Sequence, residues 1–377
     1  MKILCNFQDW NHNEQRRLED AYGGVGYYRI VKPSQFIKGH EVELIGQELK
    51  RYGKGLDMRY DNLFKDVDVY WTSYFCEGKT ASAMFTARDK YSKKVIIDVD
   101  DNYLDILPTN PIYDKFRPTK KDRAYLSTTL FFADAITVST EPLKQRLFRH
   151  FKDVHGVEKK IFVIPNMNDL KDWNFETKKN TGKVIIGYPG SNSHYDDLKL
   201  LLPVIGKLLA KYPNLYFEAI GVIERDMLNL FEDFSPTSLE RCDILSGTWT
   251  FNEYPPLMAA RNWDIGIAPL VDSAFTRCKS HIKFMEFASL KIPCVASEVY
   301  PYFMDIGERR TIEHEKTGLL VKPSQWFDAL EFYKKLYQEH TGKEQTRISA
   351  LIYSTFFENS DFYNIVCLLY TSDAADE

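Results

Sequence analysis

The feature that most constrains this chain is an alternation of short apolar runs with longer stretches of helical spacing, which occurs twice along its 377 residues. Strands are predicted first at 3–7, 42–45, 67–74, 95–99, 135–139 and 161–164, and then at 184–188, 215–220, 264–268, 294–297 and 319–321. Helices are predicted at 27–38, 79–90, 120–133, 141–151, 196–212, 254–262, 281–290 and 326–338. Continuous apolar strands joined by helices are typical of α/β parallel sheets covered on both faces.

The two series indicate two Rossmann-like domains, at 1–166 and 183–344, joined by a polar linker at 167–182. A chain of this length is also long enough for two hydrophobic cores. Ligands of such folds bind beyond the carboxyl ends of the strands. We therefore expect the parallel sheets to face a central cleft that holds the site.

Composition narrows the class of protein. The formal net charge of −4 gives no basic excess for nucleic-acid binding, so no nucleic-acid partner is expected. Scattered cysteines without a CxxC motif favour reduced thiols over disulfides or a zinc site, and no apolar run reaches membrane-spanning length. We expect a cytoplasmic protein and leave peripheral membrane contact open. Residues 367–377 read as an adaptor-derived artefact and are excluded from the interpretation of the fold.

The segment 279–297 carries the strongest functional signal. Ser280 is predicted to cap a short helix, which places Lys279 and Lys283 at its amino end and Glu286 one turn further on. Free N–H groups, the helix dipole and two ammonium groups all favour an anion there, and a carboxylate can accept hydrogen bonds from sugar hydroxyls. This pattern predicts a nucleotide-diphosphate site. A plain surface helix with a Lys–Glu pair is the alternative.

Glycines near the first predicted helix suggest a cleft wall. Gly24 and Gly26 lie between the first strand and that helix, where glycines allow a tight turn and close approach of a ligand. Arg29 stands where the last glycine of a GxGxxG dinucleotide motif would be. The segment is therefore interpreted as a loop of the cleft, with an ordinary tight turn as the alternative.

A second glycine-rich turn follows the first strand of the second series. Gly190 and Ser191 are expected to leave room for phosphate or sugar, although the turn could simply connect a strand to a helix. Arg225 is placed to reach the diphosphate, with a solvated arginine as the alternative. His194 on its own is typical of a surface or capping histidine.

Acidic residues end the strand at 95–99. Asp98, Asp100 and Asp101 can be read as a metal-binding DxD group, as hydrogen-bond acceptors for sugar hydroxyls in a metal-free cleft, or as turn and capping residues. No Ser/His/Asp or Cys/His arrangement stands out, which disfavours hydrolytic acyl chemistry.

The motifs together resemble the retaining glycosyltransferase family 4, of the two-domain GT-B type. The segments that carry the resemblance are 133–140, 163–166, 186–190, 263–270, 279–297 and 316–321. Glu286 matches the second of two family glutamates eight positions apart, which acts on the nucleotide ribose, whereas Cys278 stands at the first. The resemblance also implies that Lys279 and Lys283 hold the diphosphate, and that 345–366 begin helices crossing back to the first domain, cut short by the artefact.

The function so implied is metal-independent, retaining transfer of a sugar from a nucleotide-diphosphate sugar to a glycan, lipid or other hydroxyl acceptor, as in polysaccharide biosynthesis. No cofactor and no metal are expected besides the nucleotide-sugar co-substrate. The alternatives are a metal-dependent DxD transferase, a nucleotide-sugar epimerase and an inactive nucleotide- or sugar-binding homologue. The predicted catalytic residues are Lys279, Lys283, Asp100 and Asp101, and the predicted donor-binding residues are Gly190, Ser191, Arg225, Ser280 and Glu286.

Overall fold

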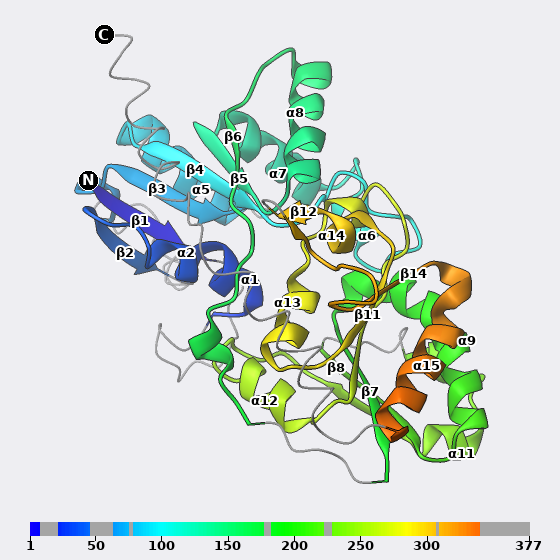
Figure 1. Ribbon diagram of the computed structural model, residues 1–377. Helices are drawn as coiled ribbons and strands as arrows, with labels where there is room; N and C mark the ends of the chain where they lie inside the picture. The colour runs from blue at the N-terminus through cyan, green and yellow to red at the C-terminus, as the bar shows by residue number, and fades with distance from the viewer. Residues whose placement is uncertain are drawn as a thin grey trace.

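The computed structural model describes residues 1–7, 22–45, 63–74, 78–176, 182–221, 228–306 and 309–339. Within these residues the strands form two six-stranded parallel sheets and one two-stranded hairpin (Figure 1). The first sheet takes its strands from residues 2–163 and the second from residues 184–321. The predicted segments 345–366 and 367–377 lie outside the described residues, as does Arg225.

The first sheet has the strand order β2-β1-β3-β4-β5-β6, and every predicted strand of the first series is confirmed. Its strands are β1 (Lys2–Asn6), β2 (Glu41–Ile45), β3 (Val69–Ser73), β4 (Lys94–Val99), β5 (Ala135–Val138) and β6 (Ile161–Val163). Its helices are α1 (Gly24–Gly26), continued by a π-helical turn at Tyr27–Val31 and by α2 (Lys32–Ser34), then α5 (Gly78–Phe85), α6 (Tyr113–Phe116), α7 (Lys121–Phe132) and α8 (Glu141–His155).

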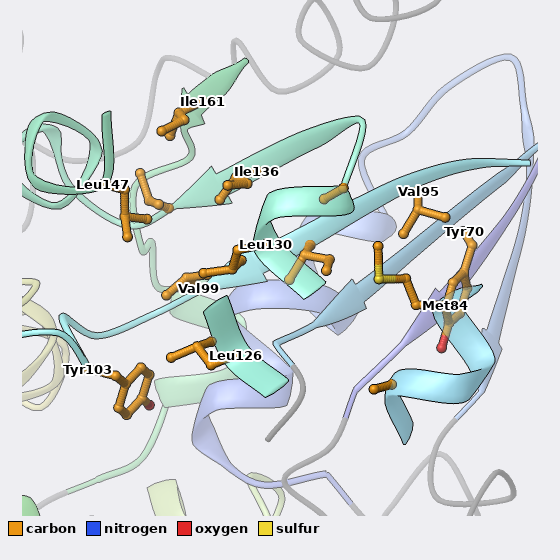
Figure 2. Close-up of a cluster of buried hydrophobic side chains, with 14 of the residues drawn as sticks. Tyr70, Met84, Val95, Val99, Tyr103, Leu126, Leu130, Ile136, Leu147 and Ile161 are labelled. Atoms are coloured by element: carbon orange, nitrogen blue, oxygen red, sulfur yellow. The ribbon is translucent and has the colours of Figure 1, made fainter. Parts of the chain in front are cut away.

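The core of the first half explains why its strands read as continuous apolar runs. Figure 2 shows Val99 of β4 beside Leu126 and Leu130 of α7, and Val95 of the same strand near Tyr70 and Met84. Ile96 of the same strand belongs to the cluster on the opposite face of the sheet. Because helices cover both faces, alternate side chains of β4 are equally buried and no polar face interrupts the sequence.

The second sheet has the order β14-β11-β10-β7-β8-β9. Its strands are β7 (Val184–Gly190), β8 (Leu215–Gly221), β9 (Cys242–Ser246), β10 (Ile265–Ala268), β11 (Cys294–Ser297) and β14 (Leu319–Val321), and β12 (Asp305–Ile306) pairs with β13 (Arg309–Arg310). Its helices are α9 (Tyr195–Lys211), α11 (Pro236–Leu239), α12 (Tyr254–Ala260), α13 (Ile282–Ser289), α14 (Tyr300–Phe303) and α15 (Trp326–Glu339). Figure 1 shows α9 and α15 packed together on the outer side of this sheet.

The five strands predicted for the second series are confirmed, but β9 was missed. It is the edge strand of the sheet, and its five residues are half-buried or exposed. The sequence Cys-Asp-Ile-Leu-Ser therefore lacks the continuous apolar run by which the buried strands were found.

Polar side chains join the two halves at several points. The Thr140 hydroxyl donates to the main-chain carbonyl of Cys278 at 2.7 Å, and the Asn102 amide donates to the carbonyl of Ala274 at 3.0 Å. The Asn110 amide donates to the carbonyl of Ser193 at 2.9 Å. These bonds hold the ends of the two sheets against each other around the site. None of the helices in the described part of the chain is both long and apolar enough to cross a membrane.

Candidate functional site

A cavity of about 240 Å³ lies between the two halves, beyond the carboxyl ends of β4, β7 and β10. Open α/β sheets bind their ligands at this edge. The predicted site residues that line the cavity are Gly24, Arg29, Asp100, Asp101, Ser191, Lys279, Ser280, Lys283 and Glu286. The sequence therefore brings most of its candidate residues to one place.

Lys283 is the most unusual side chain of the cavity. It projects from α13, is 8% exposed, and its Nζ has no hydrogen-bond partner among the described residues. Its Nζ lies 5.0 Å from the ring centre of Tyr188. Burial, reinforced by the positive charge of Lys279, lowers the pKa of Lys283 to about 7. A buried ammonium without a partner costs free energy, so its place in a cavity fits an anionic ligand.

Lys279 is held differently, because an acidic residue of the other half already neutralises it. Its Nζ lies 2.8 Å from Oδ2 of Asp101, and both side chains are less than one-fifth exposed. Nζ also lies 4.5 Å from the ring centre of Phe275. The two lysines of the predicted anion site thus differ: one is paired across the halves and the other is not.

Asp100 lies next to this pair and is itself perturbed. Burial, and then the charge of Asp101, raises the pKa of Asp100 to about 7. The Tyr103 hydroxyl donates to Oδ1 of Asp100 at 2.9 Å. A carboxyl group with this pKa can accept or donate a hydrogen bond near neutral pH.

Asp98 forms a buried ion pair with Arg29. Arg29 was interpreted as part of a cleft loop, and the ion pair corrects this part of the interpretation. Nε and Nη2 of Arg29 donate to the two oxygens of Asp98 at 2.9 and 2.8 Å, and the Thr137 hydroxyl donates to Oδ2 at 2.6 Å. Nη1 of Arg29 donates to Asn166 at 2.8 Å and to the carbonyl of Ile164. Both charged groups are at most 2% exposed.

The pair therefore fixes the turn beneath the cavity and leaves neither charge for a ligand. It also removes Asp98 from the DxD alternative. Gly26 is likewise buried and does not line the cavity, because it lies inside the helical turn that begins at Gly24.

Glu286 bridges the two halves through Tyr28 and Tyr254, which were not predicted from the sequence to belong to the site. The hydroxyl of Tyr28 donates to Oε1 at 3.1 Å, and the hydroxyl of Tyr254 donates to Oε2 at 3.2 Å. The residue is 6% exposed, and burial raises its pKa to about 7. Each carboxylate oxygen keeps a lone pair for another donor.

Ser280 lines the cavity but does not cap α13, which corrects the prediction. The cap position is His281, and the Ser280 hydroxyl accepts a hydrogen bond from the Asn166 amide at 2.8 Å. The side chain is therefore engaged with the first half of the chain and is not turned back to the helix.

Gly190 also differs from its prediction, because it does not line the cavity. A Cβ atom at this position would lie 2.5 Å from the hydroxyl of Tyr188, so the glycine makes room for an internal side chain. At Gly187 a Cβ atom would lie 1.8 Å from the Trp263 ring. These glycines are explained by packing within the second half. Ser191, the next residue, does line the cavity.

His194 lines the cavity, although the sequence predicted only a surface or capping histidine at this position. Its Nδ1 lies 2.7 Å from Oδ2 of Asp197, and Oδ1 of Asp197 accepts the Val271 N–H at 2.7 Å. The spacing of three residues at the start of a helix was the available signal, since it puts both side chains on one face.

Cys278 does not line the cavity. It is 4% exposed, and its Sγ lies 3.6 Å from the Asn102 amide nitrogen of the other half. Burial raises the pKa of its thiol to about 12. The position eight residues before Glu286 thus supplies no charged group to the cavity. Among the residues that the structure describes, no cluster of three or more His, Cys, Asp or Glu is arranged to hold a metal ion.

Comparison with known proteins identifies the fold. No family model matches the sequence, and no curated protein matches it either. Among solved structures, HepE of Anabaena in complex with UDP-glucose aligns over 100% of both chains, with a TM-score of 0.61 and 14% identity. A glycosyltransferase of Rickettsia africae ESF-5 aligns over 99% of this chain and 97% of its own, with a TM-score of 0.57 and 15% identity. The chain has a GT-B fold.

The expected α/β class and the resemblance to GT-B glycosyltransferases are therefore confirmed at the level of the fold. In a third match, the aligned region makes up a smaller share of the matched protein. TarM of S. aureus, as a G117R mutant in complex with Fondaparinux, alpha-GlcNAc-glycerol and UDP, aligns over 82% of this chain, with a TM-score of 0.54 and 16% identity. The chain spans 56% of the length of TarM.

Proposed function

We propose that this GT-B chain transfers a sugar from a nucleoside-diphosphate sugar to a hydroxyl acceptor, with retention and without a metal. The observation that carries the proposal is the buried Lys283 ammonium, whose Nζ lacks a partner in a cavity between the two sheets. A diphosphate supplies the negative charge that this group lacks. HepE and TarM, which share the fold, were solved with UDP-glucose and UDP, which makes uridine nucleotides the first probes.

The lysines would act on the leaving group. Negative charge develops on the diphosphate as the glycosidic bond breaks, and Lys279, Lys283 and the N–H groups at the start of α13 are placed to stabilise it. In retaining chemistry of this type the acceptor hydroxyl attacks from the leaving-group face. A phosphate oxygen takes its proton, and no enzyme nucleophile is needed.

The acidic residues would act on the sugars. When a diphosphate engages Lys279, the 2.8 Å pair with Asp101 is weakened, which leaves that carboxylate free to bind a hydroxyl. Asp100, with its pKa near 7, lies beside it. Glu286 is assigned to the nucleotide ribose, with Tyr28 and Tyr254 holding its carboxylate in place.

On this proposal residues 1–166 contact the acceptor, residues 183–344 hold the donor, and 167–182 link them. A cytoplasmic location, peripheral membrane contact, and a glycan or lipid-linked acceptor stay predictions. One second candidate is favoured by a specific observation. The burial of Cys278 away from the cavity removes a family carboxylate, as expected of a nucleotide-binding homologue without transfer activity.

The test is a panel of nucleotide sugars, assayed for release of nucleoside diphosphate with and without candidate acceptors. We expect slow hydrolysis of one donor, unaffected by EDTA and lost in Lys283→Met. Lys207→Met is the matched control, because Lys207 is an exposed lysine of α9. Binding without hydrolysis or transfer would favour the inactive homologue, EDTA sensitivity would favour a metal-dependent enzyme, and conversion of the donor without acceptor would favour an epimerase.

A further inference from the structure

His194 is held in one orientation by a buried carboxylate. Its Nδ1 is 2.7 Å from Oδ2 of Asp197, which is 2% exposed and fixed in turn by the Val271 N–H. The imidazole side chain is 13% exposed and lines the cavity. No hydrogen bond to Nε2 occurs among the described residues, so the ring has one nitrogen anchored and one available.

The His194 ring faces two lysine side chains in the cavity, and an anion would offset their positive charge. Burial, and then the positive charges of Lys283 and Lys279, which face the same cavity from α13 and the turn before it, hold the pKa of His194 well below its ordinary value. The acidic groups that share the cavity or its wall are Asp196, Asp197, Glu286, Asp100 and Asp101. Asp101 is already paired with Lys279, and Glu286 with two tyrosines.

We infer that His194 is a third diphosphate-binding group, which takes up a proton on Nε2 when the nucleotide binds and donates it in a hydrogen bond to a phosphate oxygen. The inference rests on the proposed function. The proton comes from solvent, and no covalent bond is made or broken. Asp197 acts as the positioning residue that holds the ring and compensates its new charge.

The electrostatics favour this order of events. Without an anion, a second proton on the His194–Asp197 pair would add positive charge beside Lys279, which is paired with Asp101, and beside Lys283, whose Nζ has no hydrogen-bond partner among the described residues. An opposite charge within about 4–6 Å raises the pKa of a cationic group by about 1–3. A diphosphate carries more than one negative charge, so it reverses the effect of the lysines. Proton uptake and anion binding then strengthen each other, and the pair titrates as one unit.

The test uses the whole chain labelled with ¹⁵N-histidine, and UDP as the probe, at about pH 8, above the ordinary histidine pKa of about 6.5. Nitrogen chemical shifts report directly whether Nε2 carries a proton. His194→Gln assigns the His194 signals, and the exposed His314 serves as an internal control. We expect His194 Nε2 to be unprotonated in the free protein and protonated with UDP bound, while His314 is unchanged.

Binding affinity provides a second readout. A charge-assisted hydrogen bond of this kind predicts that His194→Gln weakens UDP binding by about 10- to 100-fold. Binding of UDP to the wild-type chain with Nε2 still unprotonated would overturn the inference and leave the proposed function standing. Failure of UDP and every other nucleoside diphosphate to bind would overturn both.

Discussion

Replacing Lys283 with methionine is expected to separate stability from ligand binding. The lysine Nζ is buried without a hydrogen-bond partner in the described part of the chain, and its contact with the Tyr188 ring does not replace lost hydration. Methionine keeps a long apolar side chain in the same space. The free variant should therefore be at least as stable as the wild-type chain, although it loses the group that binds the diphosphate.

The magnitude follows from the depressed pKa. Lysine titrates near 10.5 in an unfolded chain, and burial lowers the pKa of Lys283 to about 7 in the folded state. Between these values the unfolded state binds more protons, so this group makes the protein more stable as the pH rises from about 7 to 10.5. At pH 7 the charge is unfavourable by up to about 4 kcal/mol. Because Asp197 and Glu286 lose a nearby cation in Lys283→Met, the net gain in the free energy of unfolding should be about 1–4 kcal/mol.

The assay is unfolding of the wild type, Lys283→Met and the control Lys207→Met, each with and without UDP, at several pH values. We expect Lys283→Met to unfold at a higher temperature than the wild type near pH 7, with a smaller rise in stability toward alkaline pH. UDP should stabilise the wild type and Lys207→Met but not Lys283→Met. A loss of more than about 1 kcal/mol in the free energy of unfolding of the ligand-free variant would contradict this expectation, because it would show that Lys283 makes a stabilising contact in the free protein.

Three further changes test other parts of the structure. Arg29→Met should lower the free energy of unfolding by about 3–5 kcal/mol, because it leaves the buried Asp98 carboxylate unpaired. The double variant with Asp98→Leu should lose less stability than the sum of the losses in the two single variants. Losses that simply add in denaturant titrations would contradict this. Gly187→Ala should cost about 1–3 kcal/mol and lower the melting temperature, because its methyl group would meet the Trp263 ring. Asp101→Asn should tighten UDP binding about 2- to 5-fold in calorimetry, because it frees Lys279, which Asp101 now neutralises. The same change should slow sugar transfer. Weaker UDP binding would show that the Asp101 carboxylate does not compete with the diphosphate for Lys279.

The parallel sheets could be predicted from the sequence because their strands are buried on both faces. Apolar runs such as Val95-Ile-Ile stand out when no polar face interrupts them, and helix signals are equally local. For example, α8 begins after Thr140, whose hydroxyl accepts the Leu143 N–H, and ends at Gly156 in a left-handed conformation. The edge strand β9 lacks this signal. The composition of β9 follows from the partial exposure of its residues, although the strand pairs with β8 as the others pair with their neighbours.

Individual roles at the site depend on partners that lie far away in the sequence. Arg29 is a plausible ligand-binding residue until Asp98, 69 positions later, is found against its guanidinium group. Ser280 is a reasonable helix cap until Asn166, 114 positions earlier, takes its hydroxyl. His194 shows the opposite case, because its partner is only three residues away and its place in the cavity follows from the second half of the chain. Local spacing predicts which elements form, and tertiary contacts decide what their polar groups do.

We propose that the cavity between the two halves binds the diphosphate of a nucleotide sugar through Lys279 and Lys283. The most direct measurement compares the binding of nucleoside monophosphates and diphosphates by calorimetry, in the wild type and in the double variant Lys279→Met/Lys283→Met. We expect one nucleoside diphosphate to bind at least about tenfold more tightly than its monophosphate, and the double variant to lose this difference. Equal affinity for the two nucleotides, or a difference that survives the loss of both lysines, would contradict it.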